Sequence, residues 1–469
     1  MSSVHRREFL RNSALLTSGA LIAPSLAGLT ACSLRAGDAS GVDRAPRVVG
    51  LGEGGYGPLV RGADWPELEL PAGFRAARLS VTGQMMSDRH RTPGAHDGMG
   101  AFALPNGNVR LIRNHENGDY PANSRVKGDP AKAYDSRGGG GTTSLEVRVR
   151  PDGTRELVRD FISLNGTIVN CAGGTTPWGS WLSCEENTEG VRHGWQKHHG
   201  YIFEVPASAE ETVQAEPLPA MGRFVHEAVA VDPDTGIVYE TEDRHLSGFY
   251  RFIPTEQGRL AAGGRLEMLA VNGQPGLNTS HGQRLGARLP VSWVPIANPD
   301  PGDAQSDNGA VFAQGFERGG ARFARLEGCW YGDRSIYFLA TSGGDARMGQ
   351  VWRFTPGSGS SGGDLMLVFE SPSADVLNMP DNICVSPRGG VVMCEDPSGN
   401  AVPHLRGLTR NGDIFDFARN VLNRSELAGA CFSPDGQTLF VNIQGSTIDA
   451  GRTLGGTFAI WGPWETGAL

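Results

Sequence analysis

The segment "HEAVAVDPDTGIVYETED", residues 226–243, joins two apolar runs through a Pro/Asp/Gly turn and carries acidic side chains at both ends. Two short apolar runs around a tight turn predict an antiparallel hairpin. Five other segments repeat this arrangement: "HDGMGAFALPNGNVRLIRNHEN" from His96, "CAGGTTPWGSWLSCEEN" from Cys171, "EGCWYGDRSIYFLATSGG" from Glu327, "DNICVSPRGGVVMCEDPSG" from Asp381 and "ELAGACFSPDGQTLFVNIQG" from Glu426. Repetition of one hairpin unit along a chain predicts a repeat array.

A third strand pattern follows each hairpin: "TTSLEVRV" at 142, "YIFEV" at 201, "FYRF" at 249, "QVWRF" at 350, "LRGLT" at 405 and "TFAIWG" at 457. Units of about four strands around a central channel form a β-propeller. The sequence therefore predicts an all-β, six-bladed β-propeller spanning residues 71–469. Too few residues follow "TFAIWG" to complete the last blade, so we expect the N-terminal segment "FRAARLSV", Phe74 to Val81, to supply its outer strand and close the ring.

Composition agrees with a fold that contains many turns. Glycine accounts for 67 of 469 residues, about twice the usual share of ~7%. Two Gly/Pro/Asp-rich stretches, residues 117–141 and about 255–320, read as loop-like insertions between repeat units. The formal net charge is −9 and no basic cluster alternates with aromatic residues beyond the N-terminal segment, so nucleic acid is not predicted as a partner.

The N-terminus reads as a targeting signal. Residues 1–32 contain the pair Arg6 and Arg7, followed by a weakly apolar stretch, which predicts recognition by the twin-arginine translocation machinery. The protein is therefore expected to be exported, to the periplasm or the cell exterior. Residues 29–32, "LTAC", resemble a lipobox, which predicts a lipid anchor at Cys32 as the single membrane contact; cleavage without lipidation is the alternative. Residues 33–70 read as a polar tether.

The cysteines beyond the signal segment fall into two groups. Five lie within apolar strand patterns and are predicted to be free core thiols: Cys184, Cys329, Cys384, Cys394 and Cys431. Cys171 differs, because its neighbours in "NCAGGTTPWG" are polar and glycine-rich.

Acidic side chains recur at matching positions of the repeat. Cys171, Glu227, Glu327 and Asp381 lead their hairpins, and the second strands end in "NHE", "CEEN", "ETED" and "ED". Converging carboxylates repel one another and are costly to bury, and a multivalent cation removes that cost. Carboxylate and amide oxygens suit Ca²⁺, whereas a thiolate favours a softer metal such as iron or zinc. The alternative is that these acids merely cap strands or remain solvated at the blade ends.

Several of these motifs together resemble the PhoX alkaline phosphatases, a twin-arginine-exported family: "NHEN", "NCAGGTTPWGSWLSCEEN", "FVHEAVAVDPDTGIVYETED", "FARLEG", "PDNICVSPRGG" and "SELAGACFSPDG". The resemblance implies a six-bladed propeller that holds iron and calcium and hydrolyses small phosphomonoesters. Carried over by motif, the implied metal ligands are Asn114, Glu116, Cys171, Glu185, Glu227, Glu327 and Glu395. Arg325 of "FARLEG" would then bind the phosphate group as the catalytic residue.

Two other functions stay open on the sequence alone. One is a lactonase-type propeller that uses a buried calcium ion, and the other is a binding propeller whose ions are structural. A phosphatase requires both the Cys171 thiolate and the Arg325 guanidinium, whereas the two alternatives require neither.

Overall fold

The computed structural model describes residues 55–118, 125–358, 362–445 and 454–469. They belong to one compact unit, residues 43–469. The twin-arginine motif, the lipobox and most of the predicted tether lie outside the described residues. Strands dominate the described part, which contains one α-helix, α2 (Ala310–Glu317), and short 3-10 helices at Val191–His193, Pro219–Met221, Leu260–Ala262 and Trp464–Thr466. No helix in these ranges is long and apolar enough to cross a membrane.

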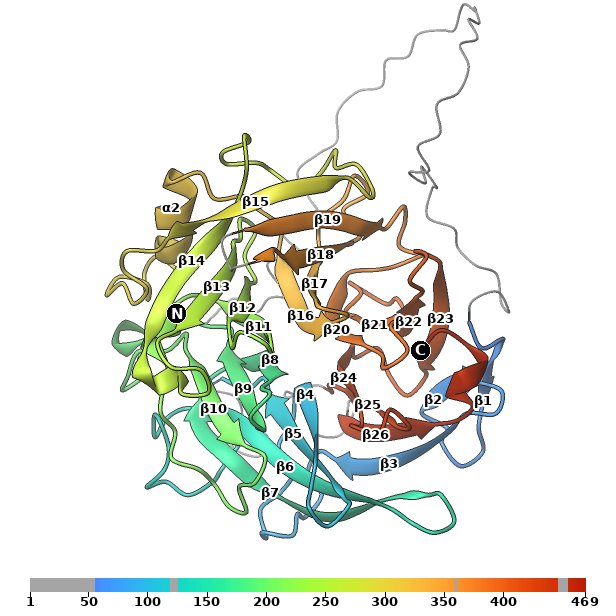
Figure 1. Ribbon diagram of the computed structural model, residues 1–469. Coiled ribbons are helices and arrows are strands. Elements are labelled where there is room, and N and C mark those ends of the chain that lie inside the picture. The colour runs from blue at the N-terminus through green and yellow to red at the C-terminus, as the bar shows by residue number, and fades with distance from the viewer. Residues whose placement is uncertain (1–54, 119–124, 359–361, 446–453) are drawn as a thin grey trace, which may run out of the picture. The chain divides into compact units, whose positions relative to one another are not determined.

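The prediction of an all-β propeller is confirmed, and each predicted hairpin forms at its expected place (Figure 1). The chain builds successive antiparallel units of three or four strands. The first three units are β4 (His96–Ala103), β5 (Val109–His115), β6 (Gly140–Val149) and β7 (Arg155–Thr167); β8 (Asn170–Thr175), β9 (Ser180–Glu185) and β10 (Ile202–Pro206); and β11 (His226–Val231), β12 (Val238–Glu242), β13 (Phe249–Pro254) and β14 (Gly264–Val271).

The later units repeat the same antiparallel order. They are β16 (Leu326–Gly332), β17 (Ser335–Ala340), β18 (Gln350–Pro356) and β19 (Gly363–Glu370); β20 (Pro380–Val385), β21 (Val391–Glu395), β22 (His404–Leu408) and β23 (Ile414–Asn420); and β24 (Leu427–Phe432), β25 (Leu439–Ile443) and β26 (Gly456–Trp461), completed by β3 (Arg75–Val81).

These units form five sheets, because one additional strand merges two of them; two further strands extend another unit. β15 (Arg288–Pro295) pairs with both β14 and β19, so the third and fourth units merge into one nine-stranded sheet. β1 (Leu59–Arg61) pairs with β2 (Leu68–Pro71), and β2 pairs with β23. The predicted tether therefore ends too late at residue 70. Its last part alternates apolar and polar side chains, and Leu68 and Leu70 enter the core.

The predicted closure of the ring by an N-terminal strand is confirmed. β3 pairs with β26 from Arg75 opposite Trp461 to Val81 opposite Gly456. Just before β3, the Phe74 ring contacts the rings of Tyr56 and Trp464 edge to face, at centroid distances of 5.0 and 4.8 Å. The Tyr56 hydroxyl also donates to the backbone carbonyl of Leu469 at 2.8 Å. The two ends of the domain are thus joined by a strand ladder and by aromatic packing.

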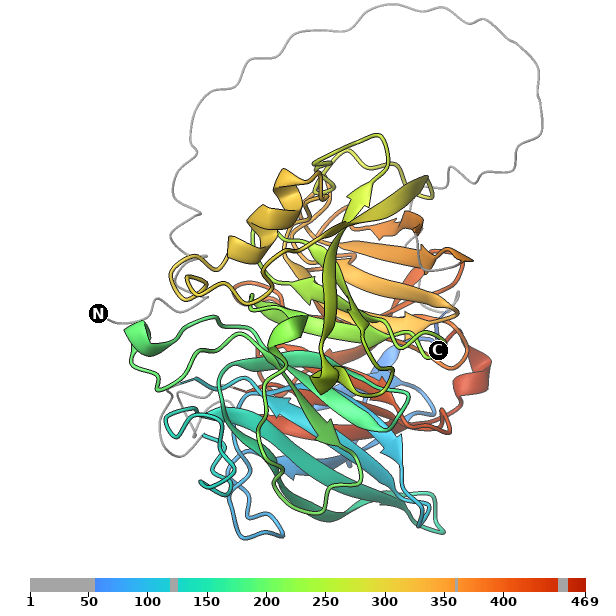
Figure 2. The same cartoon turned by 60° about the vertical axis from the view of Figure 1, so that its left-hand side comes forward.

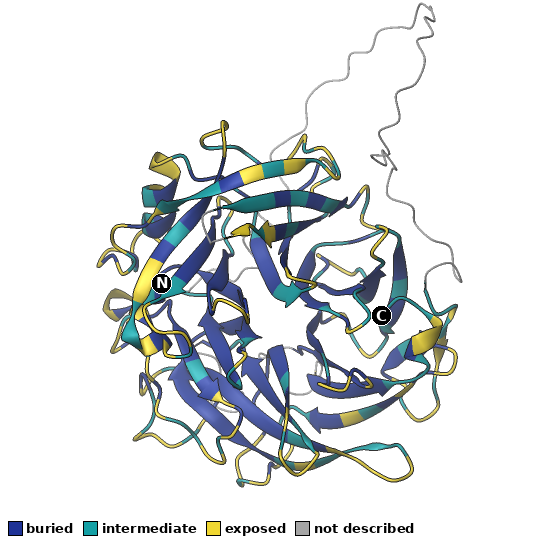
Figure 3. Ribbon diagram, in the orientation of Figure 1, coloured by how far each residue is buried: buried dark blue, intermediate teal, exposed yellow. Residues whose placement is uncertain are grey.

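The first strand of every unit lines the centre of the domain. β4, β8, β11, β16, β20 and β24 contact one another in this order, and β24 contacts β4, so they form a closed ring (Figure 1). Most of their residues are buried, as the dark blue centre of Figure 3 shows. Because these strands begin where the second strands end, residues at those two places meet at one end of the ring.

The second predicted insertion is more ordered than a loop. Residues 255–320 contain β14, β15 and α2, and α2 packs through Val311 and Phe312 into the core cluster that holds Met268 of β14 (Figures 1 and 2). The high glycine, proline and aspartate content of this stretch predicts turns, although two strands form there. Of the first insertion, residues 119–124 lie outside the described part, and β6 begins at its end, at Gly140.

Candidate metal centre

A break in strand pairing recurs in each of the six innermost strands near its start. The ladder shifts between His226 and Val229 in β11 and between Leu326 and Cys329 in β16, and the other four innermost strands shift at the corresponding place. A bulge of this kind re-aims side chains and increases local twist. Five of the six shifts bracket an acidic or thiol residue, namely Asp97, Cys171, Glu227, Glu327 and Asp381.

Carboxylates and one thiol consequently gather at this end of the ring in five overlapping groups, each with ligand atoms within 4.8 Å of one another. The groups are Glu116, Cys171 and Glu186; Asp97, Glu116 and Glu426; Glu186, Asp243 and Glu327; Glu227, Glu327 and Asp381; and Asp381, Asp396 and Glu426. We call these ten residues the acidic ring. Members from innermost strands are buried, and those that follow second strands are half-buried.

The structure brings four of the seven predicted metal ligands into the acidic ring. They are Glu116, Cys171, Glu227 and Glu327. The Cys171 thiol lies 3.3 Å from Glu227 Oε1, to which it donates a hydrogen bond. Thiol and carboxylate thus come together from neighbouring units, as the convergence of strand starts predicts.

Asn114 lies beside the acidic ring, outside the five groups. Its amide donates to the backbone carbonyls of Cys171 and Ala172, at 3.2 and 2.7 Å. Its carbonyl accepts from Trp181 Nε1 and Ser183 Oγ, both at 2.9 Å. The Asn114 side chain therefore fixes the strand that carries Cys171.

Glu185 and Glu395 also lie outside these groups. Glu185 accepts hydrogen bonds from His199 Nδ1 at 2.7 Å and from the backbone of Ile168, Gly200 and Tyr201. Glu395 accepts from Arg406 Nε at 2.7 Å and from two backbone amides. In each case the next residue joins the acidic ring instead, because successive side chains of an extended chain point to opposite faces.

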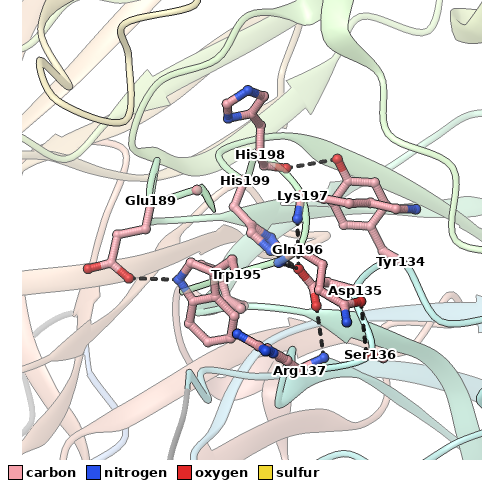
Figure 4. Close-up of polar contacts among 12 residues, drawn as sticks. Tyr134, Asp135, Ser136, Arg137, Glu189, Trp195, Gln196, Lys197, His198 and His199 are labelled. Atoms are coloured by element: carbon pink, nitrogen blue, oxygen red, sulfur yellow. Dashed lines mark hydrogen bonds and ion pairs between the residues drawn. The ribbon is translucent and has the colours of Figure 1, made fainter. Parts of the chain in front are cut away.

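The loop after Glu185 is built around His199. Its Nδ1 contacts Glu185, and its Nε2 lies 3.5 Å from Asp135 Oδ2. Asp135 also accepts from the backbone amides of Arg137, Gln196 and Lys197 (Figure 4). Burial disfavours a charged imidazole, but the two carboxylates outweigh it and raise the pKa of His199. This polar core holds the segment that follows Glu186.

Six members of the acidic ring were not among the predicted ligands: Asp97, Glu186, Asp243, Asp381, Asp396 and Glu426. An alignment of the repeats with one another identifies several of them. When the second strands are aligned, Glu116, Glu186, Asp243 and Asp396 fall in one column, with Gln444 in the sixth repeat. The Gln444 amide contacts three acids of the ring, with distances of 3.0 Å to Asp97 and 2.7 Å to Glu116 and a further contact to Glu426.

Arg325 lies at the edge of the acidic ring. It directly precedes β16 and has a φ of 52°, which places its backbone in the left-handed region, outside the strand. Its Nε and one terminal nitrogen donate to the Asp243 carboxylate at 3.0 and 2.9 Å, and its guanidinium also contacts Glu327. This two-point contact with a carboxylate matches the geometry that guanidinium uses for phosphate.

Burial and like charge act together on the acidic ring. Burial, followed by the neighbouring Glu327, raises the pKa of Glu227 well above its usual value. Burial and then Glu116 raise the pKa of Asp97, and burial with Asp396 raises that of Glu426. Burial followed by Asp97 raises the pKa of the Cys171 thiol. Protein groups alone therefore leave these acids poorly stabilised as anions.

The donor set fits multivalent cations. Glu227 Oε2 is a buried carboxylate oxygen without a hydrogen-bond partner among the described residues. Leaving such an atom unpaired is costly, and a cation pairs with it directly. The ring supplies hard oxygen donors throughout and one sulfur donor at Cys171, which suits a mixed set of ions better than a single hard ion.

Glycines follow residues of the acidic ring along the innermost strands. Gly98, Gly328 and Gly429 lie at these positions, and a Cβ at Gly98 or Gly429 would come within 2.5 Å or 2.4 Å of the neighbouring strand. These glycines let adjacent innermost strands approach closely. A cavity of about 180 Å³ lies at the other ends of β8, β11 and β16, bordered by Trp330 and Tyr331.

These features define a β-propeller with a candidate metal centre of carboxylates and one thiol at one end of its central ring. The sequence profile of the family named alkaline phosphatase PhoX matches residues 54–446. The chain belongs to this family, and it is a metal-dependent phosphatase.

One solved structure shares the fold, and others resemble it more distantly. The structure of Pseudomonas fluorescens PhoX in complex with vanadate, a transition-state analogue, superposes with a TM-score of 0.67 at 18% sequence identity, covering 88% of this chain and 99% of that one. A gluconolactonase from Xanthomonas campestris gives a TM-score of 0.41 at 12% identity, with coverages of 87% and 98%. A luciferin-regenerating enzyme gives 0.41 at 10%, with coverages of 84% and 96%. No sequence among the curated proteins matches significantly.

Proposed function

We propose that the protein hydrolyses small phosphomonoesters at the acidic ring, with iron and calcium as its metal ions. The observation that carries this proposal is the convergence of the Cys171 thiol, the buried Glu227 carboxylate and the other acids of the ring in a chain of the PhoX family. When bound, such cations neutralise phosphoryl oxygens and lower the pKa of water, which supplies the nucleophile.

Different groups of the acidic ring would bind the two kinds of metal ion. Cys171, Glu116 and Glu186 form the one group with a sulfur donor and would hold the softer ion, iron. The groups made only of carboxylates, such as Asp381, Asp396 and Glu426, would hold calcium.

Arg325 would bind the phosphoryl oxygens and stabilise their charge in the transition state. Asp243 and Glu327 hold the guanidinium beside the acidic ring, which keeps it close to any group bound there. Because the same two carboxylates are candidate ligands, cations at the ring would compete with the guanidinium for their charge and make Arg325 available to an anion.

We also propose that the protein acts outside the cytoplasm. The support is the twin-arginine pattern at Arg6 and Arg7 and the lipobox-like sequence that ends at Cys32. The described residues begin beyond both motifs. Radiolabelled lipid incorporation into wild-type protein, compared with Cys32→Ser, tests the anchor.

The activity is tested with purified protein and three probes: a simple phosphomonoester, a phosphodiester and a lactone. We expect hydrolysis of the phosphomonoester, its loss on chelation and its recovery when iron and calcium are returned. Hydrolysis of the lactone with calcium alone would support a lactonase instead. Stoichiometric metal without turnover of any probe would support a binding propeller.

A further inference from the structure

One position of the repeat carries a side chain that reaches the next unit. In each repeat, this position lies two residues before the one that Glu116, Glu186, Asp243 and Asp396 occupy in theirs. The six residues at this position are Asn114, Cys184, Thr241, Leu339, Cys394 and Asn442. All six are buried, although three of them, Asn114, Thr241 and Asn442, are polar.

The three polar side chains share one kind of partner. Asn114 donates to the carbonyls of Cys171 and Ala172, Thr241 to that of Glu327 and Asn442 to that of Asp97. Cys394 hydrogen-bonds with the backbone of Ala430 in the sixth unit. In the fourth unit this position is the apolar Leu339, and Thr341, two residues later, donates to the carbonyl of Pro380 instead. Each contact runs from the second strand of one unit, or from the residue directly after it, to the innermost strand of the next.

The acceptors lie where the innermost strands lose their regular pairing. Glu327 falls within the shift of β16, Cys171 within that of β8 and Asp97 within that of β4, and Pro380 directly precedes Asp381. A backbone carbonyl that leaves its ladder at a bulge needs another donor when it is buried. The neighbouring unit supplies that donor beside the residue that contributes to the acidic ring.

Thr241 shows the arrangement most completely. Its hydroxyl accepts from the backbone amide of Ala228 at 3.0 Å and donates to the carbonyl of Glu327 at 2.6 Å. Ala228 follows Glu227, so one hydroxyl joins the backbones that carry two acids of the same group. A hydroxyl can perform both roles at once, because it offers one proton and two lone pairs.

We propose that Thr241 is a positioning residue of the metal centre: its hydroxyl fixes the spacing of Glu227 and Glu327, and Thr341, Asn442 and Asn114 hold ring residues in a similar way at three other junctions. The inference rests on the proposed metal centre. It assigns to Asn114 a contact with the backbone of a ligand residue in place of a contact with metal.

The test compares Thr241→Val, which keeps the side-chain shape, with Thr241→Ser, which keeps the hydroxyl. The readouts are iron content by elemental analysis and calcium affinity by competition with a fluorescent chelator. We expect Thr241→Val to lose calcium affinity about 10- to 100-fold, the range seen when groups that orient metal ligands are removed. Thr241→Ser should recover most of that loss.

Thr212→Val is the matched control. The Thr212 hydroxyl also donates to a backbone carbonyl, that of Ile162 at 2.8 Å, but it lies at the outer strand β7. This variant should lose stability and keep wild-type calcium affinity. If Thr241→Val does not fold, Thr341→Val removes a hydroxyl-to-carbonyl bond at the next junction, to Pro380 beside Asp381, and carries the same comparison.

Two outcomes would overturn the inference. Wild-type calcium affinity and iron content in a folded Thr241→Val or Thr341→Val protein would overturn this inference alone. A wild-type protein that binds neither metal would overturn the proposed metal centre, and the inference with it.

Discussion

Replacing Glu227 with glutamine should change stability in opposite directions with and without metal. Glu227, Glu327 and Asp381 place carboxylate oxygens within 4.8 Å of one another. At that distance two unit charges repel by about 3 kcal/mol with an effective dielectric constant of about 20. Proton uptake by Glu227, whose pKa is raised by burial and then by Glu327, relieves part of this cost. We therefore expect metal-free Glu227→Gln to be more stable than wild type by about 1–3 kcal/mol.

With metal bound, wild type should be more stable than Glu227→Gln. The loaded wild-type protein gains stability from each bound cation, and Glu227→Gln loses one charged donor and part of that gain. Urea unfolding of both proteins, after chelation and after return of iron and calcium, measures the two differences. Glu185→Gln is the matched control, because Glu185 is equally buried but fully hydrogen-bonded and should lose stability in both conditions. A Glu227→Gln protein that is destabilised equally with and without metal would refute the account of the acidic ring.

Three other predictions concern catalysis, ring closure and pH. Arg325→Ala should keep its metals and turn over a phosphomonoester more slowly, with an activation barrier higher by roughly 2–4 kcal/mol. Arg325→Lys should recover part of this loss. Unchanged turnover in steady-state kinetics would reject the role of Arg325 in binding phosphate. Phe74→Ala should cost about 3–5 kcal/mol of unfolding free energy, and a loss below 1 kcal/mol would show that the closure is loosely packed. Burial raises the pKa of Tyr56 to about 12, so between pH 10 and 12 the unfolded chain loses this proton and the folded protein keeps it. The unfolding free energy should then fall as pH rises, by about 1 kcal/mol after solvent screening; an equal fall in Tyr56→Phe would exclude this residue as the cause.

The sequence was sufficient to predict the fold because its signal is repeated. Each hairpin offers the same pattern of apolar strand, turn and apolar strand, and the unpaired segment Phe74 to Val81 matches the incomplete last blade. The merging of two units through β15 could not be predicted, because its Arg288–Pro295 strand lies in a stretch rich in turn residues.

The ligand set was harder to predict, because adjacent acids compete for one position. Glu185 and Glu186, like Glu395 and Asp396, differ in which face of the chain they occupy. Local composition does not distinguish the members of such a pair. Aligning the repeats distinguishes them, because Glu116 shows which position at the end of a second strand contributes to the acidic ring. The role of Arg325 depends on a backbone turn with positive φ, which a strand pattern cannot predict.

Elemental analysis of wild-type protein purified without chelators tests the metal centre most directly. We expect iron and calcium to remain bound through purification, with more than one ion to each chain, because the five groups of the acidic ring offer overlapping sets of buried and half-buried donors. A folded protein that contains neither metal in stoichiometric amount would contradict this expectation.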